Sequence, residues 1–356
     1  MAGYSALDRL LHRLALDALP IAEASFDLDQ ITLRGAAEDT AAGRHVFVCG
    51  LARAGTTVLM RRFHATGAYC SLTYRHMPFV LAPRLWGRLA RGSRRTLPAT
   101  ERAHGDGILV DADSPESLDE VFWRVFDGER YIARTHLKPH APDAETARKY
   151  VANVAAILST SATPGMRYLS KNNNNVLRLE TIRRLFPHAL ILVPFRHPLT
   201  HAASLLRQHR RFLEAQRDDA FIRSYMTWLA HHEFGGDHRP FRFEPGDARK
   251  LASFGSGEID YWLEVWRQTY GWLERVAPER VTFVCYEDLC EREETLAGLL
   301  ALAGVDGEAG HGERLRLSPT AVGNPRDRAL AEEAVDLYAR LVQRARAHLP
   351  SHATGV

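Results

Sequence analysis

The sequence predicts an α/β fold in which helices cover both faces of a central, mostly parallel sheet, giving three layers with helical insertions. Short apolar runs alternate with segments of helical periodicity, the pattern of parallel strands joined by helices. The run ALILVPF at 189–195 is almost continuously apolar, as expected for a strand buried on both faces. The other expected strands are residues 45–49, 131–134, 167–171 and 281–286.

Helices are expected between these strands and at both ends of the chain. Leucines at helical spacing predict an amphipathic helix over residues 4–18 that docks on the main body. The dipeptide Ser114-Pro115 predicts a helix start, with the serine as cap and the proline at the first helical position. The remaining helices are expected near residues 55–65, 143–159, 176–186, 261–272 and 328–348, with others beginning at 198 and 287.

The order of these elements divides the chain into three parts. Residues 1–43 are expected to be a helical extension packed on the core, residues 44–305 the α/β domain, and residues 306–356 a C-terminal segment with a helix. Two insertions interrupt the α/β domain near 74–130 and 234–257. The first contains a stretch rich in arginine, glycine and proline that resembles a lid, and the second is glycine-rich and is expected to be a mobile loop.

Composition sets limits on location and partners. The 356 residues are 46% hydrophobic and 25% charged, with a formal net charge of +3. This mild excess suits a small anionic ligand and gives no support for nucleic-acid binding. The four cysteines form no C-x-x-C pair, which indicates free thiols in a reducing compartment. No signal peptide is visible and no apolar run approaches the roughly 18 residues of a membrane span, so a cytoplasmic location without a transmembrane segment is expected.

A glycine loop follows the first expected strand. Gly50 and Gly55 keep the G-x-x-x-x-G spacing of a phosphate-binding loop, between a strand and a helix. In the Walker A pattern a lysine follows the second glycine, but Thr56 stands there and Thr57 comes next. The cation lies inside the loop, at Arg53. This P-loop-like arrangement favours one phosphate with a group attached over a triphosphate, although a simple strand–turn–helix has similar glycines.

An arginine follows the most apolar strand, where a P-loop ATPase or kinase often carries an aspartate for magnesium. Arg196 can bind a phosphate through two N–H groups, and Pro198 begins the next helix. Ser204 lies about two turns into that helix, on a similar face. Each residue alone is unremarkable, but their position after the strand predicts a second anion site.

The two motifs together resemble the sulfotransferase superfamily that uses 3′-phosphoadenosine 5′-phosphosulfate (PAPS). The segment 51–57, LARAGTT, is similar to the family's 5′-phosphosulfate loop, and Arg196 with Ser204 is similar to its 3′-phosphate motif. The segment 284–289, VCYEDL, resembles a third and weaker motif. The similarity covers roughly residues 44–305 and is greatest to bacterial sulfotransferases and, in the loop, to tyrosylprotein and carbohydrate sulfotransferases.

The resemblance implies a reaction and its binding residues. The enzyme would transfer a sulfuryl group from PAPS to a hydroxyl or amine of a small-molecule, carbohydrate or peptide acceptor by in-line displacement, without a metal, leaving 3′,5′-bisphosphoadenosine (PAP). Arg196 and Ser204 would hold the 3′-phosphate. The 5′-phosphosulfate would be held by Arg53, Ala54, Gly55, Thr56 and Thr57. The alternatives are a P-loop nucleoside kinase or ATPase and a non-catalytic nucleotide-binding protein.

A lysine and four asparagines end the strand at 167–171. The resemblance places Lys171 near the oxygen that bridges phosphate and sulfur, where its charge would stabilise the leaving group together with Arg53. Asn172 or Asn173 would orient the lysine or bind the acceptor, and Asn175 is the expected helix cap. Asn173 stands where cytosolic relatives carry a catalytic histidine, so the base must lie elsewhere.

Several residues remain candidates for that base. His76 is the nearest one after the loop helix, because the matching stretch has no carboxylate. Arg75 beside it is a candidate acceptor ligand. His136 is a rival for the base or an acceptor-binding residue, and Asp111 and Asp113 rank lower.

Overall fold

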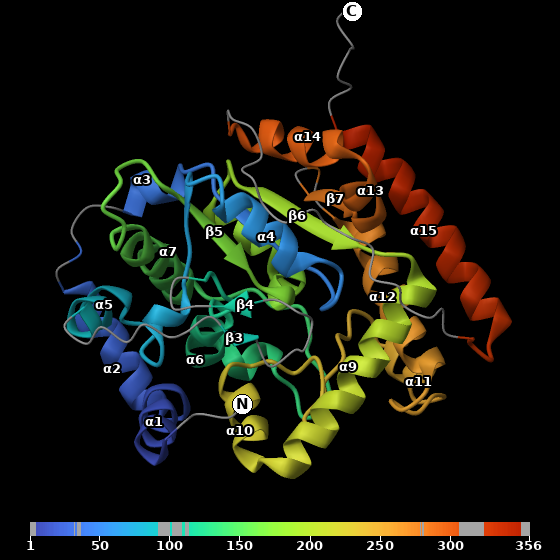
Figure 1. Cartoon of the computed structure of the whole chain (residues 1–356), viewed down its shortest axis with the longest axis horizontal. Coiled ribbons are helices and arrows are strands. Elements are labelled where there is room, and N and C mark those ends of the chain that lie inside the picture. Colours follow the sequence, from blue (N-terminus) through green and yellow to red (C-terminus); the bar gives the residue numbers. More distant parts are fainter. Residues whose placement is uncertain are drawn as a thin grey trace, which may run out of the picture.

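The computed structural model describes residues 5–31, 33, 37–91, 100–101, 109–110, 114–277, 279, 281–305 and 324–349. These residues form a five-stranded parallel sheet in the order β2-β5-β1-β6-β7, with helices on both faces (Figure 1). This confirms the predicted α/β class. The strands are β1 (Val46–Val48), β2 (Tyr69–Cys70), β5 (Arg167–Lys171), β6 (Leu190–Phe195) and β7 (Val281–Cys285). A separate antiparallel pair joins β3 (Thr100–Glu101) and β4 (Leu109–Val110).

Alternate residues of the strands pack into different apolar clusters, which is why the expected strands are apolar throughout. In β1, Val46 and Val48 join one cluster of the described core and Phe47 joins the other. The first cluster lies under α4 (Thr56–His64), α13 (Tyr286–Glu291) and α14 (Glu293–Ala303). The opposite face packs against α6 (Glu120–Tyr131), α7 (Ala144–Leu158), α8 (Leu179–Leu185), α9 (Pro198–Asp218), α12 (Ile259–Val276) and α15 (Arg328–His348).

The N-terminal segment is helical, but its leucine stripe does not dock as expected. It forms α1 (Ala6–His12), a π-helical turn (Arg13–Asp17) and α2 (Leu19–Gln30). Leu7, Leu10 and Leu14 are 64%, 52% and 39% exposed. The π turn changes the helical phase, so Ala15 and Leu16 are buried instead.

Smaller elements complete the described fold. The short helices are α3 (Ala37–Ala41), α5 (Pro83–Arg91), α10 (Ala220–Trp228) and α11 (Asp247–Leu251), with 3-10 turns at Tyr74–His76 and Asn173–Arg178. The segment 234–257 is irregular except for α11, and it is anchored by buried Phe234 and Phe241. Among the described helices, none is both long enough and apolar enough to cross a membrane.

Two expected elements are wrong. The strand expected at 131–134 does not form, because Tyr131 ends α6 and its hydroxyl donates to the buried Glu120 carboxylate. The helix start expected at Ser114 is also displaced. Pro115 forms a bridge with Thr73, and α6 begins only at Glu120. In both places a tertiary contact overrides the local pattern.

Candidate active site

The carboxyl ends of the parallel strands meet at one edge of the sheet, where α/β proteins bind their ligands. Val48 in β1 is in register with Lys171 in β5 and with Leu192 in β6. The backbone N–H of Asn172 continues this pairing by donating to the Val48 carbonyl at 2.9 Å. The glycine loop that follows β1 therefore lies between the residues that end β5 and those that end β6.

The glycine loop reaches α4 through two left-handed residues. Arg53 has φ 69° and Gly55 has φ 94°. A side chain at Gly55 would not fit, because an added Cβ would lie 2.3 Å from the ring of Tyr286. The left-handed conformation costs a non-glycine residue about 1–2 kcal/mol, so the fold holds Arg53 in it against a local preference. Thr56 and Thr57 are buried in the first turn of α4, where backbone N–H groups face an incoming anion.

The residues of the two sequence motifs meet in the fold. Arg53 Nε donates to Ser204 Oγ at 3.4 Å, although 151 positions separate them. Arg196 Nη1 donates to the Arg53 carbonyl oxygen at 3.4 Å, and its guanidinium lies 4.8 Å from the centre of the Tyr286 ring. Arg196 Nε is buried and has no hydrogen-bond partner among the described residues. A buried cationic donor without an acceptor suits a bound anion, as the 3′-phosphate role requires.

A histidine fixes the loop to α9. His201 Nε2 lies 2.8 Å from the Ala52 carbonyl oxygen, to which it must donate. Burial lowers the pKa of His201 to about 3, against the opposite effect of this hydrogen bond, so the ring is neutral near pH 7. The start of α9 is also held, because the His197 backbone N–H donates to Glu287 Oε1 at 2.9 Å. The sequence analysis missed His201, although it lies between the two residues of the 3′-phosphate motif.

A glutamate lies beside the end of β5. Asn173 Nδ2 donates to Glu233 Oε1 at 2.8 Å, across 60 positions of sequence. Burial acts to raise the pKa of the Glu233 carboxyl. Charge interactions with His231 and Lys171 and the hydrogen bond from Asn173 outweigh burial, so this pKa lies below its ordinary value. Glu233 also lines a pocket that Leu51 of the glycine loop borders. The sequence analysis missed Glu233 because it lies in an irregular connection after α10.

The asparagines after β5 face the protein interior. Asn172, and not the expected Asn175, caps the 3-10 turn, with its Oδ1 accepting from the Asn174 backbone N–H at 3.0 Å. Asn172 Nδ2 donates to Glu120 Oε2 at 2.6 Å. Since both ends of its side chain are engaged within the protein, Asn172 supports the strand end.

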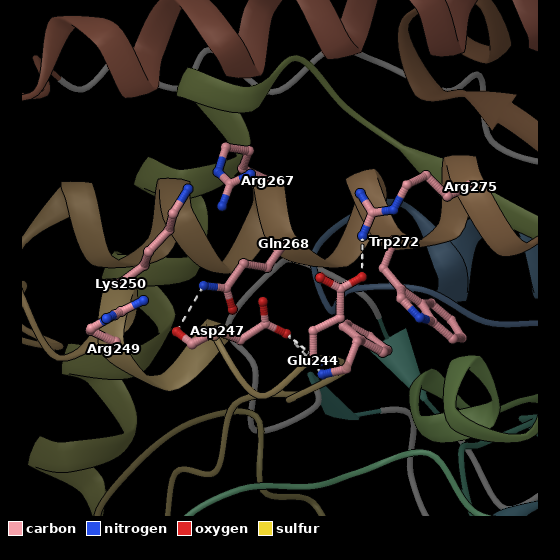
Figure 2. Close-up of a pocket in the computed structure, with 10 residues that line it drawn as sticks. Glu244, Asp247, Arg249, Lys250, Arg267, Gln268, Trp272 and Arg275 are labelled. Carbon is pink, nitrogen blue, oxygen red and sulfur yellow. Dashed lines mark hydrogen bonds and ion pairs between the residues drawn. The ribbon is translucent and has the colours of Figure 1, made fainter.

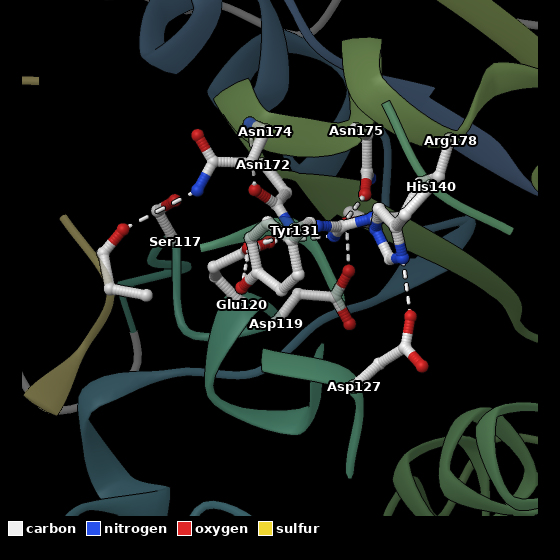
Figure 3. A network of polar contacts seen from close by, with 12 residues as sticks. Ser117, Asp119, Glu120, Asp127, Tyr131, His140, Asn172, Asn174, Asn175 and Arg178 are labelled. Carbon is white, nitrogen blue, oxygen red and sulfur yellow. Dashed lines mark hydrogen bonds and ion pairs between the residues drawn. The ribbon is translucent and has the colours of Figure 1, made fainter. Parts of the chain in front are cut away.

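Glu120 belongs to a buried polar network behind β5 (Figure 3). Arg178 donates to both of its oxygens, at 2.7 and 2.9 Å, and each side chain is at most 1% exposed. Arg178 Nε also donates to His140, whose ring contacts Asp127. This network fixes the segment that carries Lys171.

The other base candidates are placed less favourably. His76 Nδ1 accepts from the Thr73 backbone N–H at 3.0 Å, which engages the only lone pair of the neutral ring. Arg75 is exposed on the same 3-10 turn. His136 lies in the turn between the bridged residues Ile132 and Leu137. Asp111 and Asp113 lie outside the described residues.

A second cavity, of about 330 Å³, lies beside α11 and α12 (Figure 2). Its charged lining residues are Glu244, Asp247, Arg249, Lys250, Arg267 and Arg275. Both carboxylates are engaged there. Glu244 pairs with Arg275 at 2.7 Å, and Asp247 Oδ2 accepts from the backbone N–H groups of Phe243 and Glu244 at 2.9 and 2.8 Å. The acids of this cavity are therefore not candidates for proton transfer at the strand edge.

Comparison with known families identifies the family of the chain. The model of the sulfotransferase family matches residues 45–244, more than half of the chain. The chain belongs to the sulfotransferase family. The matched region contains both anion motifs and Lys171, and family membership implies that this sulfotransferase uses PAPS as its donor. The kinase and ATPase alternative is thereby replaced.

Solved structures of bacterial sulfotransferases align with this chain at low sequence identity. Sulfotransferase STF9 from Mycobacterium avium is 13% identical with a TM-score of 0.49, and the alignment covers 96% of this chain and 87% of that one. STF1 from Mycobacterium tuberculosis H37Rv is 15% identical with a TM-score of 0.46, and the alignment covers 97% of this chain and 88% of that one. A sulfotransferase from Alicyclobacillus acidocaldarius is 15% identical with a TM-score of 0.36, and the alignment covers 85% of this chain and 94% of that one. No curated protein sequence matches significantly.

Proposed function

We propose that this sulfotransferase moves the sulfuryl group of PAPS to a hydroxyl or amine acceptor by in-line displacement, without a metal ion. The observation that supports this most is the contact of Arg53 with both Ser204 and Arg196. One nucleotide with a phosphate at each end of its ribose can reach both motifs only if they border one site. A kinase would need a place for a triphosphate and magnesium, and the loop carries Thr56 where the Walker pattern has its phosphate-binding lysine.

In this proposal the protein binds PAPS at both ends, the 3′-phosphate and the 5′-phosphosulfate. Arg196 Nε and Ser204 Oγ hold the 3′-phosphate, which distinguishes PAPS from other adenine nucleotides. The 5′ end lies on the loop and the first turn of α4, where the donors come from Arg53, Ala54, Gly55, Thr56 and Thr57. The Arg53–Ser204 hydrogen bond, long at 3.4 Å, gives way when the two residues bind opposite ends of the nucleotide.

Lys171 acts on the leaving group in this proposal. PAPS supplies a sulfuryl group on a phosphate that leaves as an anion, so charge builds on the bridging oxygen as the bond breaks. Lys171 ends β5 in register with Val48, directly beside the start of the glycine loop. A cation held there by the buried network stabilises the departing oxygen, and Arg53 shares the charge on the sulfuryl oxygens.

The function is tested by following PAP formation from PAPS with a panel of acceptors that includes phenols, aliphatic alcohols, saccharides, amines and tyrosyl peptides. We expect acceptor-dependent PAP release together with a sulfated product whose mass is raised by one sulfuryl group. ATP with Mg²⁺ serves as the control donor and should yield no phosphorylated product. Phosphoryl transfer from ATP, with no reaction from PAPS, would contradict the proposal.

A further inference from the structure

The reaction requires a group that takes the acceptor's proton. As the acceptor oxygen forms its bond to sulfur, the sulfur–phosphate oxygen bond breaks and its electron pair leaves with PAP. The hydroxyl proton must then pass to a base within hydrogen-bond reach. Neither Lys171, which is a cation in this role, nor Asn173, which has no basic atom, can accept it.

We propose that Glu233 is the general base of the transfer and that Asn173 positions its carboxylate. This inference rests on the proposed function. The first argument is place: Asn173 follows Lys171 by two residues, and its amide donates to Glu233 Oε1 at 2.8 Å. Glu233 therefore lies at the strand end that carries the cation for the leaving group, although it comes from the connection after α10 (Ala220–Trp228).

The second argument is access to the donor side. Glu233 shares the lining of a single pocket with Leu51 and Ala52, the residues that open the glycine loop. The same pocket is closed on other sides mainly by apolar groups, among them Leu205, Phe241 and Trp262. The free space of this pocket is about 30 Å³, room for one hydroxyl-sized group, so the hydroxyl of the acceptor would enter it and lie between the carboxylate and the loop while the body of the acceptor stays outside. Because the pocket has little room for water, the electrostatic attraction between the carboxylate and the hydroxyl proton is stronger there than in bulk solvent.

The third argument is the state of the carboxylate itself. The Asn173 amide donates to Oε1 of this carboxylate. Charge interactions with His231 and Lys171 help to hold the pKa of the carboxyl below its ordinary value, so the group is ionised near neutral pH. An ionised carboxylate at this position can accept a proton from a substrate.

The fourth argument is that nearby carboxylates are engaged elsewhere. Asp237, on the same connection, accepts from Arg223 at 2.7 and 2.8 Å. Glu287 accepts from the His197 backbone and Tyr338, and so supports α9. Together with the engaged acids of the α11–α12 cavity, this leaves Glu233 as the best-placed carboxylate among the described residues.

The test is Glu233→Gln in the full chain, because glutamine keeps the shape and can still pair with Asn173 but cannot take a proton. The variant is compared with wild type on acceptors of graded acidity, from an aliphatic alcohol to 4-nitrophenol at a pH where this phenol is ionised. We expect kcat/KM for weakly acidic hydroxyls to fall about 100-fold or more. The loss should shrink toward none with ionised 4-nitrophenol, which has no proton to give.

Two controls separate catalysis from structure. Asp237→Asn removes a carboxylate from the same connection and should leave kcat/KM near wild type. PAP should stabilise Glu233→Gln against melting as much as it stabilises wild type. If wild type itself showed no response to PAP, the proposed function would fail before the base is in question.

The contrary outcomes are distinct. An equal loss for every acceptor, whatever its acidity, would mean that Glu233 only shapes the site. Near-normal turnover of the alcohol would place the base elsewhere. Loss of the PAP response in Glu233→Gln alone would assign the residue to donor binding, and each of these results overturns the proposal.

Discussion

Two polar regions flank β1, and they use their hydrogen bonds differently. On the β5 side, Glu120, Arg178 and Asn172 are joined by contacts of 2.6–2.9 Å in the buried interior. On the β6 side, Arg53 and Arg196 are joined to the site by contacts of 3.4 Å, and Arg196 Nε has no partner in the described chain. Glu120, Arg178 and Asn172 satisfy one another, whereas Arg196 keeps a charged donor for a ligand.

This difference explains how one strand edge can be rigid and still bind a ligand. A buried charge pair with complete hydrogen bonding costs much to break but offers nothing to a substrate. Long contacts between an arginine, a hydroxyl and a carbonyl are easily exchanged for shorter ones to an anion. We expect substitutions on the β5 side to change stability, and substitutions on the β6 side to change donor affinity.

The largest expected effect comes from breaking the paired region. Glu120→Gln leaves the Arg178 charge buried without its counter-ion and should lower the free energy of unfolding by about 3–5 kcal/mol. Urea unfolding of the variant and of wild type measures this loss in the free energy of unfolding. Glu180→Gln is the matched control, because its pair with Arg183 is solvent-exposed and should contribute little to the free energy of unfolding. Similar losses in the two variants would remove the contrast between the regions.

The next effect concerns the residue that the paired region supports. Lys171→Ala should reduce kcat about 100-fold or more, on the scale of losing one preorganised donor to a developing anion. Binding of PAP should change much less, because the lysine acts as charge builds on the bridging oxygen. Steady-state kinetics with PAP titrations separate the two readouts. Lys149→Ala, which breaks the ion pair of a half-buried lysine with the exposed Glu145, serves as a control. A kcat close to wild type for Lys171→Ala would reject the role of the lysine at the leaving group.

On the β6 side, Arg196→Ala should weaken PAP binding about 10- to 100-fold, the scale of a charge-assisted hydrogen bond. The affinity of this variant for adenosine 5′-phosphate, which lacks the 3′-phosphate, should be close to that of wild type. Calorimetric titration of both ligands provides the comparison, with Arg211→Ala on the exposed part of α9 as the control. Equal losses for the two nucleotides would place Arg196 away from the 3′-phosphate.

The smallest effect tests how the loop is fixed to α9. Because burial lowers the pKa of His201 to about 3, the unfolded chain binds one more proton than the folded chain between pH 6.5 and about 3. Stability therefore falls as the pH falls through this window, and this residue contributes about 2 kcal/mol of that loss between pH 7 and pH 5.

His201→Gln, which keeps a donor for Ala52 but does not titrate, should show a shallower decline of unfolding free energy over the same pH range. His188→Gln, on the exposed surface, should decline as wild type does. An unchanged slope in His201→Gln would show that the ring titrates with an ordinary pKa.

The sequence predicted the parts of this site that lie next to strands. Arg53, Lys171 and Arg196 each follow a recognisable apolar run, so the parallel sheet alone brings them to one edge. Glu233 and His201 carried no such signal, because one lies in an irregular connection and the other is one of seventeen histidines. Their positions depend on how α9 and α10 pack, which a local pattern does not encode.

The same distinction explains the errors. The leucines at 7, 10 and 14 have helical spacing, but spacing does not reveal which side of a helix is covered. The asparagines after β5 look like a polar turn, yet all four are buried, and their side chains pair with Glu120, Glu233, Arg178 and a backbone carbonyl. A buried polar network is assembled from distant segments, and its members look like surface residues in the sequence.

The most direct test of the shared donor site is a melting experiment on the full chain with PAP, compared with adenosine 5′-phosphate plus inorganic sulfate. One nucleotide held at both ends should stabilise the fold by about 2.7 kcal/mol at 100 times its Kd. The same concentration of adenosine 5′-phosphate with sulfate should give a clearly smaller shift. Equal stabilisation by the two ligand sets, or none by PAP, would contradict the joining of Arg53, Arg196 and Ser204 in one PAPS site.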